Sequence, residues 1–309
     1  MRPFQRISGV NRRQFLALAA ATPFAVRKGT LPGAPVALVT CDAESRLSVV
    51  DLHTFRIVGS IATLPDPRAV ETVGGLALVC HTAVGALSIV DRHRVRHVIR
   101  VVVEPRYTAA HPDGRHAFVT DSGRSGVVVV DVLRGRILDR VALPGWARHT
   151  TLSPDGRTLW VGLGSASEHV AVLRTGPLER ERLLTPGFLA HDVGHAPDGR
   201  LWVTSGAEGV LAVGSARHAA DLAPQHVTFG EGRAFVTSGD SGTFHVQTLD
   251  GRVLARHPVP VGSYNVQYAR GLVITPSLDH GTLSVFSGRG AHLGTVQVAG
   301  SCHDACVLA

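Results

Sequence analysis

The sequence predicts an all-β protein, a seven-bladed β-propeller made of four-stranded antiparallel blades. Three observations lead to this fold class. One stretch of the chain reads as four short strands joined by tight turns. Related stretches recur with a period of about forty residues, which is typical of propeller blades. The first and last stretches are incomplete, and each supplies what the other lacks.

The clearest unit is Pro105–Gly145. Its turns are set by Pro112-Asp113-Gly114 and Arg134-Gly135-Arg136, because Pro fixes φ and Gly accepts positive φ. A polar loop, Asp121–Gly126, separates its middle strands, and the β-branched runs suit a pleated, half-buried surface. The predicted strands are Tyr107–Ala110, His116–Thr120, Val127–Val130 and Ile137–Leu143.

Five further units repeat this pattern. Ser153–Arg157 and Ala196–Arg200 both contain Pro-Asp-Gly-Arg, and a Leu-Trp-Val strand follows each turn. A sheet this small is not stable alone, so each unit requires neighbours of its own kind. The five units are Pro67–Glu104, Trp146–Gly187, Phe188–Gln225, His226–Ser263 and Tyr264–Ser301.

The two ends of the repeat region complete one blade together. Ala34–Asp66 has only the last three strands of a unit, and Cys302–Leu308 supplies the missing inner strand. This closure removes the free edge between the first and last blades. A solenoid of stacked sheets is the main alternative, but a solenoid would not need complementary ends. We therefore expect one propeller domain over residues 34–309, preceded by a leader over residues 1–33.

The repeat resembles a known family. Pro112-Asp113-Gly114-Arg115, the strand Phe118-Val119-Thr120 and a following Val-Val-Asp strand are similar to the YVTN-type repeat of YncE-like seven-bladed propellers. The likeness covers about residues 34–309 and implies the same fold. Members are mostly non-enzymatic and functionally diverse, so it implies no particular ligand. This chain has Phe-Val-Thr-Asp and Phe-Val-Thr-Ser in place of Tyr-Val-Thr-Asn.

The leader resembles a twin-arginine export signal. Asn11-Arg12-Arg13-Gln14-Phe15-Leu16 carries the paired arginines, the apolar run Phe15–Val26 follows, and Arg27-Lys28 comes behind it. The run is too short to span a bilayer as a helix, so we expect no transmembrane span. Export would place the protein in the periplasm, the cell envelope or the medium. The alternative is a chance Arg-Arg pair before a short helix.

Charge and composition favour anionic partners. The net charge is +7 and the pI is about 10.0, and Lys28 is the only lysine, so arginine carries the positive charge. A coding bias toward arginine is the alternative explanation. The sequence has no run of five basic residues and no aromatics interleaved with arginine, which argues against specific nucleic-acid recognition.

Two of the four cysteines fall where the ends meet. In the register of the complete blades, Cys302 corresponds to Pro105 and Cys41 to Asp121, which face each other across the first hairpin. We therefore predict a Cys41–Cys302 disulfide, which suits an oxidising compartment. The alternative is that the cysteines are small buried thiols, and other pairings stay open.

The residues that begin the inner strands form the candidate ligand site. They lie beside the channel mouth of a propeller, where polar groups remain hydrated. Three arginines in this ring favour a carboxylate or phosphate group, because guanidinium forks match those geometries. The alternative is that these groups cap strand ends and pair with carboxylates. The ring comprises Arg68, Arg106, Arg148, His191, His226, Asn265 and His303, and the next position holds Tyr107, His149, Asp192 and Asp304 among others.

A metal site is the second hypothesis. His191, His226 and His303 come from different blades, and Cys306 is expected near the same rim, as are His81, Cys41 and Cys302. Imidazole and thiolate ligands suit zinc or copper. No short spacing signature marks such a site.

Catalysis is the third hypothesis. The YncE-like fold is similar to propeller lactonases, which place acidic and amide ligands around a channel metal, and to streptogramin lyases, which pair histidines with a glutamate at a magnesium site. Here the ring is basic, with only Asp192 and Asp304 nearby and Glu71 deeper. Neighbouring residues on a strand point to opposite faces, which argues against a His191–Asp192 dyad. The favoured hypothesis is therefore a non-enzymatic propeller of the cell envelope that binds a small anionic ligand, a peptide or a partner protein, and a metal-dependent lactonase or lyase is the last alternative.

Overall fold

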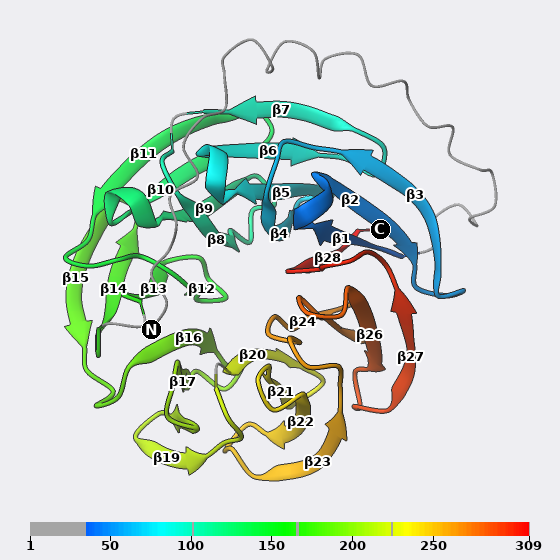
Figure 1. Ribbon diagram of the computed structural model, residues 1–309. Coiled ribbons are helices and arrows are strands. Elements are labelled where there is room, and N and C mark those ends of the chain that lie inside the picture. Colours follow the sequence, from blue (N-terminus) through cyan, green and yellow to red (C-terminus); the bar gives the residue numbers. More distant parts are fainter. Residues whose placement is uncertain (1–34, 101, 165–166, 224, 309) are drawn as a thin grey trace, which may run out of the picture.

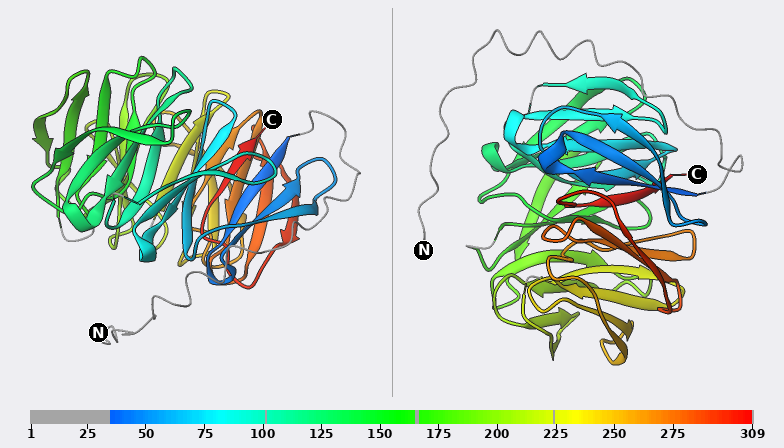
Figure 2. Two further views of the ribbon diagram at one scale, coloured as in Figure 1. Left: turned by 90° about the horizontal axis from the view of Figure 1, so that it is seen from above. Right: turned by 45° about the vertical axis from the view of Figure 1, so that its right-hand side comes forward.

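The computed structural model describes residues 35–100, 102–164, 167–223 and 225–308. They form seven four-stranded antiparallel sheets that follow one another around a central channel (Figure 1). Seen from the edge, the strands run across the thickness of the ring (Figure 2). The predicted fold class, a closed seven-bladed propeller, is confirmed.

Each blade has one strand beside the channel and three further out. Blade one consists of β28 (Ala305–Leu308), β1 (Val36–Cys41), β2 (Arg46–Asp51) and β3 (Arg56–Ala62). Blade two consists of β4 (Pro67–Val73), β5 (Leu76–His81), β6 (Ala86–Val90) and β7 (Val95–Ile99). Blade three consists of β8 (Pro105–Ala110), β9 (His116–Asp121), β10 (Gly126–Asp131) and β11 (Arg136–Ala142). The short 3₁₀ helices η2 (Asp42–Glu44), η3 (Thr82–Val84) and η4 (Ser122–Arg124) join the second and third strands of these blades.

The remaining blades follow the same order from the channel outward. Blade four consists of β12 (Thr150–Leu152), β13 (Thr158–Gly162), β14 (Val170–Thr175) and β15 (Leu178–Leu184). Blade five consists of β16 (Ala190–His195), β17 (Leu201–Ser205), β18 (Val210–Val213) and β19 (Ala216–Ala219). Blade six consists of β20 (Gln225–Gly230), β21 (Arg233–Ser238), β22 (Thr243–Thr248) and β23 (Val253–Pro258). Blade seven consists of β24 (Gln267–Ala269), β25 (Leu272–Pro276), β26 (Thr282–Ser287) and β27 (His292–Gln297).

Two aspartate-closed turns explain the repeated sequence signature. In the Pro-Asp-Gly turn of blade three, Gly114 has a φ of 66°, and Asp113 accepts backbone hydrogen bonds from the two residues after the glycine, at 2.8 and 2.9 Å. The aspartate at the end of the third strand in blades one, two and three does the same for the next turn. Asp51, Asp91 and Asp131 all accept a hydrogen bond from the backbone N–H three residues later.

The inner strands are irregular where they begin. In blades two, three and five the pairing register shifts between Pro67 and Ala69, between Pro105 and Thr108, and between Ala190 and Val193. In blades four and seven, regular pairing starts only at Thr150 and Gln267. Except in blade six, where His226 pairs regularly with Thr237, the residues at the channel mouth therefore lie in bulges or before the strand proper, where strict alternation of side chains does not hold.

The core consists of apolar clusters between neighbouring blades. One cluster joins blades seven and one through Val39, Val50, Ile274 and Val285, all of which are fully buried. A single blade cannot bury both of its faces, so the ring must close for the core to form.

The C-terminal strand closes the ring as predicted. β28 pairs antiparallel with β1, with Cys306 opposite Leu38. Thr40 donates its backbone N–H to the Asp304 carbonyl at 2.8 Å. Cys41 and Cys302 are free and buried in the same core cluster, and each shifts the pKa of the other. The two residues are therefore neighbours, and their oxidation to a disulfide stays a prediction.

The predicted export signal lies outside the described residues. Within the described ranges, no helix is long and apolar enough to cross a membrane.

Candidate functional site at the channel mouth

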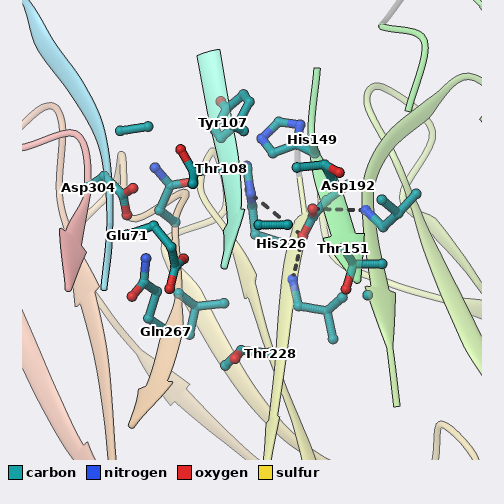
Figure 3. Close-up of a pocket in the computed structure, with 18 of the residues that line it drawn as sticks. Glu71, Tyr107, Thr108, His149, Thr151, Asp192, His226, Thr228, Gln267 and Asp304 are labelled. Atoms are coloured by element: carbon teal, nitrogen blue, oxygen red, sulfur yellow. Dashed lines mark hydrogen bonds and ion pairs between the residues drawn. The ribbon is translucent and has the colours of Figure 1, made fainter. Parts of the chain in front are cut away.

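The channel contains a polar cavity of about 320 Å³, lined by inner-strand segments from all seven blades. Tyr107 and His149 lie at one end of this cavity, and Thr228 lies at the other (Figure 3). The carboxyl groups of Glu71, Asp192 and Asp304 lie between them (Figure 3). The cavity is thus lined by hydrogen-bonding and ionisable groups along its length.

The arginines at the mouth converge on one place. Burial, followed by the positive charges of Arg68, Arg106 and Arg148, lowers the pKa of His303 to about 3. Each of these arginines directly precedes a residue that lines the cavity, namely Ala69, Tyr107 and His149. Arg68, Arg106 and Arg148 therefore stand at corresponding places on three consecutive blades.

The three arginines differ in their partners. Arg106 forms an ion pair with Glu104, and Arg68 lies 3.9 Å from a carboxylate oxygen of Asp66. Within the described ranges, Arg148 forms no ion pair with a carboxylate, and its Nε is buried without a hydrogen-bond partner. Its guanidinium carbon lies 4.9 Å from the centre of the Trp146 ring, and that of Arg106 lies 5.4 Å from the same ring. Arg148 is therefore held by stacking while its charge remains uncompensated.

Three histidines from consecutive blades form a compact cluster beside these arginines. His149, His191 and His226 each offer a ring nitrogen, and the three nitrogens lie within 4.8 Å of one another. Nε2 of His191 is 3.2 Å from Nε2 of His226. Nδ1 of His149 donates to the backbone carbonyl of His191 at 2.8 Å. This bond leaves the lone pair on Nε2 of His149, and that atom is buried with no hydrogen-bond partner.

These histidines are neutral near pH 7. Burial lowers the pKa of His191 to about 3, and Arg148 adds to the shift. Burial, followed by the neighbouring histidines and Arg148, holds the pKa of His149 and His226 well below the usual value. A neutral imidazole keeps one free lone pair, which is the form that binds metal ions.

Asp192 and Asp304 join neighbouring blades. Asp192 accepts hydrogen bonds from the backbone N–H of Val193 at 2.8 Å and of Val227 at 2.9 Å. Asp304 accepts in the same way from Ala305 at 2.8 Å and Val70 at 2.9 Å. Burial raises the pKa of both carboxyl groups to about 7, against the effect of these hydrogen bonds. Each aspartate thus bonds to its own blade and to the next one, and these bonds explain why aspartate stands at both positions.

Glu71 lies deeper in the channel. Burial raises its pKa to about 8, and repulsion from Asp304 contributes. Gln267 lies beside it in the cavity and donates to the backbone carbonyl of Val70 at 3.1 Å (Figure 3). This end of the cavity therefore contains a protonated carboxyl group at neutral pH.

The structure groups the predicted metal ligands differently from the sequence hypothesis. His191 and His226 are neighbours, but their third partner is His149, while the amide of Asn265 donates to the backbone carbonyl of His303 at 2.8 Å. Cys306 packs in the apolar cluster between blades one and two. His81 has both ring nitrogens engaged, at 3.2 Å to the Pro65 carbonyl and 2.9 Å to the Ser88 hydroxyl.

A second group of potential ligands lies in the turn between β8 and β9 of blade three. His111 and His116 both contact one carboxylate oxygen of Asp113, at 3.1 and 2.6 Å. The other oxygen of Asp113 closes the turn through two backbone hydrogen bonds. Both oxygens of Asp113 thus have partners within the turn, and its side chain is 37% exposed. The structure of the turn accounts for the grouping of these three side chains.

Comparison with known proteins supports the fold alone. No protein-family model matches the chain, and no curated protein is significantly similar in sequence. A protein of unknown function from Desulfotomaculum acetoxidans has a TM-score of 0.76 at 14% identity, over 88% of this chain and 98% of that one. A protein from Lactobacillus plantarum has a TM-score of 0.69 at 15% identity, over 89% of this chain and 99% of that one. The β-propeller domain of Cps50 (Swd1) from Myceliophteria thermophila has a TM-score of 0.63 at 11% identity, over 75% and 86%.

Proposed function

We propose that this propeller binds a small anionic ligand at the mouth of its central channel. The observation that carries the proposal is the position of Arg68, Arg106 and Arg148 on three consecutive blades, each directly before a residue that lines a polar cavity of about 320 Å³. Arg106 and Arg148 also lie over the same ring, that of Trp146. Guanidinium groups match the geometry of carboxylates and phosphates, and they hold such groups by paired, charge-assisted hydrogen bonds. The size of the cavity favours a small molecule over a folded partner, although an acidic peptide end offers the same chemistry.

Arg148 is the residue on which binding would depend most. Arg68 and Arg106 already have the carboxylates of Asp66 and Glu104 as neighbours. A ligand carboxylate or phosphate would give Arg148 the anionic partner that its surroundings do not supply. Stacking against Trp146 limits the rotation of its guanidinium group, so little side-chain entropy is lost on binding.

The other members of the ring would complete the site as neutral groups. His191, His226, Asn265 and His303 can donate to or accept from hydroxyl and carbonyl groups of a ligand. Their neutrality leaves the arginines as the source of positive potential at the mouth. The ligand expected from this arrangement is a small hydroxylated or keto carboxylic acid, or a phosphorylated compound of similar size.

The test is a binding screen with matched variants. Tag-free protein would be titrated calorimetrically with mono-, di- and tricarboxylates, sugar phosphates, inorganic phosphate and short acidic peptides. We expect Arg148→Ala to weaken the bound anion at least about tenfold, in line with the loss of one charge-assisted hydrogen-bond pair. Arg289→Ala, at a position with an 83% exposed side chain on blade seven, should leave the affinity unchanged. Absence of binding by every anion, or full affinity in Arg148→Ala, would rule the proposal out.

We also propose that the chain is an exported member of the YncE-like propellers. The repeat pattern and the closed ring support this assignment, and the paired Arg12 and Arg13 before an apolar run support the twin-arginine route. The ligand would then be met in the cell envelope or outside the cell. Replacing both arginines with lysine should retain the protein in the cytoplasm, and unchanged export of that variant would contradict the route.

A further inference from the structure

We propose that His149, His191 and His226 form a binding site for a divalent transition-metal ion, zinc or copper. The inference does not depend on the arginines of the proposed function. It rests on the placement of three buried ring nitrogens from three consecutive blades, and on one of them having no partner.

The spacing of the nitrogens suits a single ion. Zinc–imidazole bonds of about 2.0–2.1 Å in a tetrahedral shell separate two ligand atoms by about 3.3 Å. Nε2 of His191 and Nε2 of His226 are 3.2 Å apart, close to that separation. The third nitrogen, from His149, lies within 4.8 Å of the others, so a small rotation of its ring brings all three to one ion.

The hydrogen bonds around the cluster prepare the nitrogens for a metal. Nδ1 of His149 donates to the His191 carbonyl at 2.8 Å, which fixes the tautomer with Nε2 unprotonated. Nδ1 of His226 lies 3.8 Å from a carboxylate oxygen of Asp192, within reach of an outer-shell partner after a small shift. Metal-bound histidines usually hold their second ring nitrogen in this way, through a backbone carbonyl or a carboxylate.

Burial explains why the free lone pair of His149 points to a ligand. His149 is 3% exposed, so water does not readily satisfy its Nε2. Buried polar atoms without partners are rare because desolvation without a hydrogen bond is unfavourable. A bound cation would satisfy Nε2 of His149 and would replace the 3.2 Å hydrogen bond between Nε2 of His191 and Nε2 of His226.

Three histidines leave part of a tetrahedral shell open. Sites with three protein ligands normally take a water molecule or a ligand atom in the fourth position. The arginines at the same mouth would favour an anion there. A metal ion and an anionic ligand would then support each other's binding at one site.

The test measures metal binding directly in the tag-free protein. Calorimetry with zinc chloride should give one tightly bound ion per chain. His149→Gln should lower the affinity at least about a hundredfold, because loss of an outer-shell partner alone typically costs 10- to 100-fold. His303→Gln and His116→Gln are the controls, since His303 lies at the mouth outside the cluster and His116 belongs to the turn of blade three. Both controls should retain one tight site, and so should Arg148→Ala, which separates this inference from the proposed function.

X-ray absorption spectroscopy of the zinc-loaded wild-type protein identifies the zinc ligands directly. It therefore tests the proposal even if His149→Gln fails to fold. The expected spectrum contains three imidazole ligands and no sulfur. Loss of the site in His116→Gln, a sulfur ligand, or no zinc bound by the wild-type protein would each overturn the proposal.

Discussion

At the scale of single residues, buried carboxyl groups link the stability of the ring to pH. Burial raises the pKa of Glu71 to about 8 and that of Asp192 and Asp304 to about 7. An acid with a raised pKa binds its proton more tightly in the folded state. Its full contribution to the free energy of unfolding is therefore present at pH values below its pKa in the unfolded state. The stability falls as the pH rises from that value toward the pKa in the folded state.

Replacing Glu71 with Gln should make this pH dependence shallower. Between about pH 5 and pH 8, one such group changes the free energy of unfolding by at most about 1.4 kcal/mol per pH unit. Because Glu71 lines an open cavity, we expect a smaller change than this limit. Urea denaturation at several pH values measures the slope, and Glu71→Gln should be more stable than the wild type at pH 8. Glu181→Gln, exposed on β15, is the control. Equal slopes for Glu71→Gln and the wild type would contradict the assignment.

Single residues also show where inference from the sequence stops. The repeat alignment correctly placed seven polar residues at the inner-strand starts, but it did not group His149 with His191 and His226. Alternation of side chains along a strand would send the neighbours Arg148 and His149 to opposite faces. His149 precedes the regular strand β12, and His191 lies in a bulge of β16, so alternation fails at both positions. Only the coordinates show which faces these side chains take.

At the scale of elements, strands followed from the sequence more closely than the segments between them. The four strands of blade three begin and end within about two residues of the predicted bounds. The predicted polar loop Asp121–Gly126 contains the 3₁₀ helix η4 instead of irregular chain. A contact between residues that are distant in sequence accompanies this helix. Asp121 accepts backbone hydrogen bonds from Val103 at 3.0 Å and Glu104 at 2.8 Å, which ties this segment to the connection from the previous blade.

The turn between β4 and β5 offers a matched pair of glycines. Gly74 and Gly75 have φ angles of 55° and 86°, a region that other residues adopt at a cost of about 1 kcal/mol. A Cβ on Gly74 would overlap the backbone carbonyl of Gly114 in the next blade, whereas a Cβ on Gly75 would meet no atom within 4 Å. Gly74→Ala should therefore destabilise the protein by at least about 1 kcal/mol more than Gly75→Ala. Thermal and urea unfolding of the two variants would measure the difference. Equal losses would show that the turn can move away from Gly114, and the close packing of these two turns would then not contribute to stability.

At the scale of the whole molecule, the fold does not determine the function. Solved propellers of 11–15% identity align over 75–89% of this chain, so very different sequences satisfy the same ring. All of them must share the repeat period, the turns and the apolar faces between blades, and the sequence shows these three features. The fold does not require particular residues at the mouth of the channel, so the arginines and histidines there are informative about binding.

The ring closes where residues from opposite ends of the repeat region meet in blade one. Cys41 precedes η2 near the N-terminal end, and Cys302 precedes β28 near the C-terminal end. The neighbouring Cys302 thiol lowers the pKa of Cys41 to about 7, and the Cys41 thiol raises the pKa of Cys302. A thiol that ionises near neutral pH reacts more readily in disulfide exchange. The pair is thus placed and activated for oxidation in an oxidising compartment.

Oxidation of Cys41 and Cys302 should stabilise the closed ring strongly. The disulfide would close a loop of roughly 260 residues, and the loop-entropy model gives a stabilisation of about 5.6 kcal/mol. We expect peptide mapping of protein from an oxidising compartment to show the Cys41–Cys302 link, and we expect a reductant to lower the melting temperature by several degrees. Cys302→Ser should melt at the reduced value and should not respond to reductant, while Cys80→Ser should respond as the wild type does. Four alkylatable thiols in the unfolded, oxidised protein would contradict the link. In that case the hydrogen bonds between β1 and β28 and the apolar packing of blade one against blade seven would have to hold the ring closed without it.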